Sequence, residues 1–152
     1  MKRMLTAALA MMMTASIALG HCQVPCGIYG DQLRFQQMLE DENTIAKAQA
    51  QINAFAESAH NAQDINQVSR WVTAKEEHAQ KIQDTIAAYF MAQRIKADNK
   101  DYIKQITAAH KVMVAAMKCK QSADPATAKA LETAIFDFYK AYEGKEPKFE
   151  TP

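Results

Sequence analysis

From position 31 onward, apolar residues recur at alternating steps of three and four along four stretches, the spacing of a buried helix face. In the first stretch, after a turn at Gly30 and with Asp31 as the expected N-cap, these positions are Phe35, Met38, Ile45, Ala48, Ile52, Phe55 and Ala59. Asp41, Glu42 and Asn43 interrupt this stripe. The helix therefore either runs through them, with Glu42 at a seam position, or breaks into two pieces there.

Three more helices are expected after polar connectors at 61–64, 96–100 and 121–125. Asp64 is expected to cap the second helix, and Asp124 with Pro125 to begin the fourth. The predicted buried positions are Ile65, Val68, Val72, Ala79, Ile82, Ile86 and Phe90 in the second helix, with Tyr89 widening the stripe and Trp71 beside it; Ile103, Ile106, His110, Met113 and Met117 in the third; and Ala128, Leu131, Ile135, Phe138 and Tyr142 in the fourth.

Four amphipathic helices with short connectors predict an all-α fold, an antiparallel up-and-down four-helix bundle over residues 31–143. A loose tail is expected at 144–152. Neither an internal repeat nor strand-like alternation is visible in the sequence.

The first 20 residues resemble a secretory signal peptide. Lys2 and Arg3 form a basic start, 4–17 an apolar core, and 18–20 a small-x-small cleavage site. The apolar run is short for a membrane span and contains hydroxyl residues. Cleavage by signal peptidase after Gly20 is therefore expected. It would export the protein, most simply to the periplasm, without a membrane anchor and with His21 as the first residue.

Composition excludes some partners. Without Lys2 and Arg3, 16 basic and 17 acidic residues remain, a net charge of about −1. Proteins that bind nucleic acids or anionic membranes usually carry a clear basic excess. Neither kind of partner is expected here.

Three of the four histidines and one of the three cysteines are expected to have structural roles or none, and not to bind a metal. His60 and His78 are expected on solvated polar faces, and Glu57 with His60 is a single Glu-x-x-His pair where a helical di-metal site needs two. His110, on the apolar stripe, is expected in the core or an interface. Cys119 is expected to be partly exposed and not to be a metal ligand.

The unusual chemistry lies in residues 21–30, a predicted metal-binding hook. The amine of a terminal His21, the amide nitrogen and thiolate of Cys22, and the thiolate of Cys26 can form a planar nitrogen and sulfur donor set. Such a set suits Ni(II) or Cu(II) better than tetrahedral zinc. It predicts one-electron redox cycling. In an oxidising compartment, a Cys22–Cys26 disulfide is the plainer alternative.

The segment His21-Cys22-x-x-Pro25-Cys26-Gly27-x-Tyr29 resembles the nickel hook of the nickel superoxide dismutases. The similarity extends to the chain length, the helices and the Asp124-Pro125-Ala126-Thr127 segment. It implies one nickel ion per subunit, bound by the amine of His21, the amide of Cys22 and the sulfurs of Cys22 and Cys26, with the His21 imidazole axial. It also implies that Tyr29 lines the substrate pocket, that Pro25 is cis, and that the protein is a homo-hexamer.

The sequence departs from the family pattern at three places. Gln23 replaces a usual aspartate. The family also holds the axial imidazole with a glutamate and an arginine outside the hook. Gln36 or Gln37 aligns with the glutamate, and His78 with the arginine. Amide and imidazole groups are therefore expected to hold the imidazole here, or to hold it less firmly, and so to tune the metal.

The leading hypothesis is therefore a superoxide dismutase that cycles between Ni(II) and Ni(III) and converts superoxide to oxygen and hydrogen peroxide. The same hook also suits an exported protein that binds or senses nickel or copper without turnover. A structural bundle closed by the disulfide is the third reading.

Overall fold

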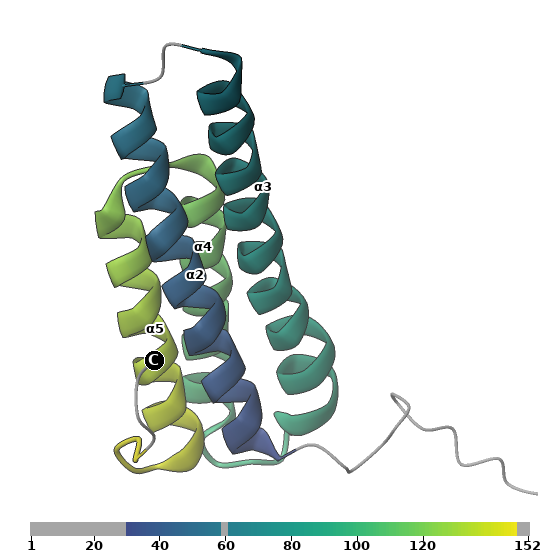
Figure 1. Ribbon diagram of the computed structural model, residues 1–152. Helices are drawn as coiled ribbons and strands as arrows, with labels where there is room; N and C mark the ends of the chain where they lie inside the picture. The colour runs from purple at the N-terminus through teal and green to yellow at the C-terminus, as the bar shows by residue number, and fades with distance from the viewer. Residues whose placement is uncertain (1–29, 59–60, 149–152) are drawn as a thin grey trace, which may run out of the picture.

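The computed structural model describes residues 30–58 and 61–148. These residues form four α-helices, α2 (Asp31–Ser58), α3 (Ala62–Asp84), α4 (Tyr102–Gln121) and α5 (Pro125–Glu143), and one π-helical segment, η1 (Thr85–Arg94), which continues α3 (Figure 1). None of the described residues lies in a strand. The all-α prediction is confirmed.

Successive helices of the bundle run in opposite directions (Figure 1). Helix α2 packs against α3 and α5, and α4 packs against α3, η1 and α5, so each helix contacts its two neighbours around a ring. This arrangement confirms the antiparallel up-and-down bundle. The α2–α3 hairpin extends past the connection between α4 and α5 (Figure 1). None of the described helices has both the length and the hydrophobicity that a membrane crossing requires.

Capping residues fix where the helices begin and end. Asp124 accepts the Ala126 N–H at 2.9 Å, and Pro125 is the first residue of α5, as predicted. Helix α3 begins earlier than predicted, because Asn61 caps it and accepts the Asp64 N–H at 3.0 Å. Asn and Asp are about equally good caps, so the sequence did not separate them. Gly144 ends α5 at φ 71°, a left-handed conformation that glycine adopts without steric cost.

The core confirms most of the predicted stripes. Helix α2 is continuous through Asp41 and Asn43, with Glu42 buried at the seam, which is the first of the two alternatives. The stripe of α5 is buried, apart from the half-buried Tyr142. In α3, the first turns are more exposed than predicted, with Ile65 63% exposed. The fully buried residues with the largest side chains are Tyr139, Phe35, Phe90, Phe138, Met38, Leu39, Ile45, Ile82, Ile86, Leu131, Ile135 and Gln49.

The predicted inner face of α4 is only partly correct: Ile106 and Met113 are half-buried and pack against the core, but the other three residues are exposed. Ile103 is 72% exposed, Met117 is 40% exposed, and His110 is exposed rather than in the core. The residues that face the core are instead mostly small: Gln105, Ala108, Ala109, Val112, Ala115, Ala116 and Cys119. Small side chains allow neighbouring helices to approach closely, since the distance between helix axes depends on the side chains at the contact. The larger Ile and Met residues therefore lie on or near the surface.

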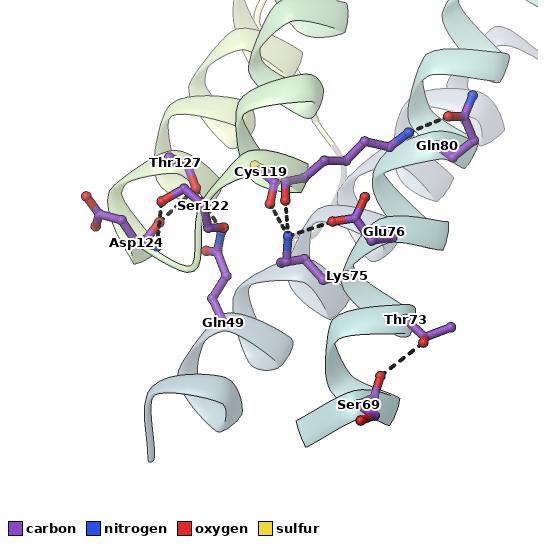
Figure 2. Close-up of polar contacts among 11 residues, drawn as sticks. Gln49, Ser69, Thr73, Lys75, Glu76, Gln80, Cys119, Ser122, Asp124 and Thr127 are labelled. Carbon is purple, nitrogen blue, oxygen red and sulfur yellow. Dashed lines mark hydrogen bonds and ion pairs between the residues drawn. The ribbon is translucent and has the colours of Figure 1, made fainter. Parts of the chain in front are cut away.

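Lys75 and Cys119 join α3 to the end of α4 (Figure 2). The Lys75 side chain is 5% exposed, and its Nζ donates to the carbonyl of Cys119 at 2.7 Å, to that of Lys120 and to Glu76 Oε1 at 3.0 Å. The last carbonyls of a helix have no partner within it and carry partial negative charge, which an ammonium group satisfies. Cys119 was predicted to be partly exposed; it is fully buried, and burial raises the pKa of its thiol.

Candidate metal centre

The predicted ligands His21, Cys22 and Cys26, together with Pro25 and Tyr29, lie outside the described residues. The structure does describe the point where the hook joins the bundle. This point is Asp31, the first residue of α2 and two residues after Tyr29. The surroundings of Asp31 therefore fix the base of the hook.

Asp31 receives four hydrogen bonds from two other elements. Tyr89 Oη donates to it at 2.6 Å and Tyr142 Oη at 2.9 Å. Arg94 donates to both carboxylate oxygens, from Nε and Nη2, at 2.8 Å each. These bonds tie the start of α2 to η1 and α5. We call these four residues the Asp31 anchor. Asp31 was expected to cap α2, but its carboxylate binds these elements instead.

The charges within the Asp31 anchor are strongly coupled. Burial alone would raise the pKa of Asp31, but hydrogen bonds from Arg94, Tyr89 and Tyr142 lower it below its usual value. Burial and the hydrogen bond to Asp31 raise the pKa of Tyr89 and of Tyr142 to about 12. The anchor therefore holds an ionised carboxylate and two neutral phenols at neutral pH.

The π-helical geometry of η1 explains how Tyr89 and Arg94 reach one carboxylate. A π-helix pairs residues five apart, as the Ile95 N–H does with the Phe90 carbonyl at 2.8 Å. Tyr89 and Arg94 are also five apart, and the Arg94 guanidinium lies 5.9 Å from the centre of the Tyr89 ring. The α-helical interpretation of the sequence missed this segment. Its one signal is the five-residue step between the buried residues Phe90 and Ile95.

His78 is held by a carboxylate rather than solvated, so its predicted polar-face position is wrong. Its Nδ1 lies 2.6 Å from Asp41 Oδ1, and the two side chains are 24% and 17% exposed. Burial raises the pKa of Asp41, and the bond to His78 partly offsets this effect. Gln37, an aligned position outside the hook, lies one helical turn before Asp41 and therefore on the same side of α2. Gln36 and Gln37 are both exposed.

The described part of the bundle offers no rival metal centre. No group of three His, Cys, Asp or Glu side chains within 30–58 and 61–148 is placed to hold a metal ion. His60 lies outside these ranges, and Cys119 is buried. By contrast, thiolate and nitrogen donors such as those of His21, Cys22 and Cys26 fit nickel. The donor chemistry of residues 21–26 is thus the part of this chain that suits the metal.

Comparison with known proteins agrees with the donor chemistry. A family model, described as nickel-containing superoxide dismutase, matches residues 15–146, which include the hook and all four helices. No curated protein and no solved structure matches the chain. Nothing in the match supports a metal-binding protein without turnover. The chain therefore belongs to the nickel-containing superoxide dismutase family, and it is a nickel-dependent oxidoreductase that acts on superoxide.

Proposed function

We propose that residues 21–30 hold one nickel ion per subunit, through the amine of His21, the amide nitrogen of Cys22 and the thiolates of Cys22 and Cys26. The proposal is supported by the donor types, which suit a planar nickel site. It is also supported by the family match, which extends across these positions. The His21 imidazole would be a further nickel ligand in this proposal, and Tyr29 would line the pocket and limit access to superoxide.

Bound nickel would supply one-electron chemistry between Ni(II) and Ni(III), by which one superoxide would be oxidised to oxygen and a second would be reduced and take up two protons to give hydrogen peroxide. The chain contributes the binding and positioning groups. A rigid base is one of them, because the Asp31 anchor fixes the residue from which the hook leaves the bundle. Groups that orient a metal ligand tune the metal as well.

Maturation is part of the proposal, because the amine of His21 exists only after a cut. Signal peptidase would cleave after Gly20 and release an exported, periplasmic enzyme. Assembly as a homo-hexamer is also proposed. It is supported by the resemblance of the chain to the family, and the exposed large apolar side chains are candidates for the contacts: Leu33, Ile65, Val72, Met91, Ile103 and Met117.

One purified sample tests these proposals together. We expect a chain mass that begins at His21, one nickel per chain, an electron paramagnetic resonance signal of oxidised nickel, and a native mass six times that of the chain. A chain that begins elsewhere would contradict the ligand set. A different native mass would contradict the hexamer alone.

His78 is proposed to position the axial imidazole in place of the family arginine. Since Nδ1 is bonded to Asp41, only Nε2 of His78 remains for another partner. Replacing such a group typically costs roughly 10–100-fold in activity or metal affinity. We expect His78→Ala to lower activity within this range and to change the resonance signal of oxidised nickel.

The exposed His110 provides a matched control for this prediction. His110→Ala should leave both the activity and the signal unchanged. Equal behaviour of the two variants would show that His78 has no role at the metal, even if His78→Ala were less stable.

A further inference from the structure

A pocket of about 310 Å³ lies between α2 and α5, within the described part of the chain. Its walls combine apolar side chains with the carboxyls of Glu42 and Glu132, the amide of Asn43 and the ammonium of Lys129. The apolar residues of this α2–α5 pocket are Leu39, Ala46, Pro125 and Ala128. Its volume is at the lower end of the range, about 300–1,000 Å³, that is typical of small-molecule sites.

Glu42 is the unusual residue of the α2–α5 pocket. It is 9% exposed, yet its carboxyl has no hydrogen bond or ion pair to any residue in the described ranges. Burial, with a smaller contribution from Glu132, raises the pKa of Glu42 to about 7. A buried carboxylate without a partner destabilises a fold by several kcal/mol, roughly, and proteins usually pair it. The carboxyl of Glu42 therefore has no positively charged partner among the described residues.

Lys129, the cation in the wall of this pocket, does not pair with Glu42. Lys129 bonds to Glu132 rather than to Glu42, and its side chain is 76% exposed. The charged groups that act on Glu42 are thus Glu132 and Lys129 of α5, and Glu42 in turn contributes to the raised pKa of the Cys119 thiol on α4. Because Glu132 and Lys129 pair with each other, Glu42 carries the unpaired negative charge of the pocket once it is ionised, above about pH 7.

We propose that the α2–α5 pocket binds an organic cation, an ammonium or guanidinium group, which pairs with Glu42. Hard metal ions require six or more oxygen ligands, and no group of three His, Cys, Asp or Glu side chains among the described residues is placed to hold one. The carbon part of the wall beside Glu42 is formed by Leu39, Ala46, Pro125 and Ala128. Carbon walls suit the alkyl part of an amine, as they suit the stem of a lysine side chain. This cation comes either from a free amine or from a lysine or arginine of a second copy of the chain.

Two arms distinguish these sources, both with the nickel-loaded mature protein at pH 7.5. In the first, the subunit dissociation constant is measured for the natural protein, for Glu42→Gln and for Glu40→Gln, an exposed position on the same helix. A side chain of a second copy predicts at least tenfold weaker association for Glu42→Gln alone. In the second, calorimetry follows the binding of n-butylammonium, methylguanidinium, neutral butanol and Mg²⁺. A free amine predicts saturable binding of the two organic cations only, at least tenfold weaker in Glu42→Gln.

The natural protein alone keeps the test decisive if Glu42→Gln fails to fold. Because protonated Glu42 is neutral, the cation-dependent binding or association should weaken as the pH falls below about 7. Full binding at pH 5 would overturn the proposal. So would binding of Mg²⁺ in place of the amines, or no change in either arm. Superoxide dismutation should not change in Glu42→Gln, since Glu42 is not part of the metal centre.

Discussion

Adding one residue before His21 of the mature protein is expected to abolish superoxide dismutation while the bundle remains folded. An added residue converts the terminal amine into an amide and moves it along the chain, so that the planar set loses one donor. The helices are not expected to need that donor, because the residues described between 35 and 141 already form a buried hydrophobic cluster of their own. Activity should fall to the background rate, and oxidised nickel should no longer be detected by electron paramagnetic resonance. Circular dichroism should remain helical.

One residue added after Pro152 is the matched control, and it should leave activity unchanged. Full activity in the protein extended at its N-terminus would contradict the proposed coordination by the His21 amine. Loss of helical signal in that protein would instead show that the bundle depends on the hook.

Asp31→Ala is expected to reduce both stability and activity. The substitution leaves the guanidinium of Arg94 and the hydroxyls of Tyr89 and Tyr142 without their shared acceptor. Losing one partner of a hydrogen bond to a charged group costs about 1–3 kcal/mol, so urea denaturation should show a loss of this size in the free energy of unfolding. Activity should fall further than stability explains, because the base of the hook is released.

The pH dependence of stability checks the prediction for Asp31→Ala. The pKa of Asp31 is lowered from its ordinary 3.8 in the folded protein, so its stabilising effect is complete above that value and is lost as the pH falls through the folded pKa. The difference in stability between the natural protein and Asp31→Ala should therefore persist from pH 7 to about 5 and shrink below about 4. Asp98→Ala, in the exposed turn before α4, is the control and should cost almost nothing. An equal loss in both variants would show that the Asp31 anchor is not special.

Sequence periodicity predicted the buried face of α2, α3 and α5 better than that of α4. In α2, α5 and the C-terminal half of α3, the larger apolar residues mark the inner face, because only one apolar stripe is present. The N-terminal half of α3 is the exception, with Ile65 63% and Val72 38% exposed. Helix α4 carries two candidate stripes, one of Ile and Met and one of Ala, Val and Cys. Hydrophobicity favours the first, whereas close packing selects the second. Which one wins depends on how near the neighbouring helices lie, and a single sequence does not state that distance.

The candidate site divides in a similar way. The proposed ligands His21, Cys22 and Cys26 come from the sequence, because their types and spacing are local, and they stay a prediction because they lie outside the described residues. The partner of His78 could not be predicted from the sequence, because Asp41 is 37 positions away and only the α2–α3 contact brings the two together. The same holds for Arg94, whose approach to Asp31 depends on a π-helical turn that α-helical spacing does not predict. Long-range pairing and irregular helix geometry are the parts that required the structure.

The buried ammonium group of Lys75 can be used to measure local opening of the bundle. Amine-modifying reagents reach only lysines that are open to solvent, and the Lys75 side chain must leave two carbonyls at the end of α4 before it reacts. Its rate of acylation, read by mass spectrometry beside that of the exposed Lys118, measures how often this end of the bundle opens. If a variant loses activity while the acylation rate of Lys75 is unchanged, the substitution has affected the reaction and not the folding of this end of the bundle.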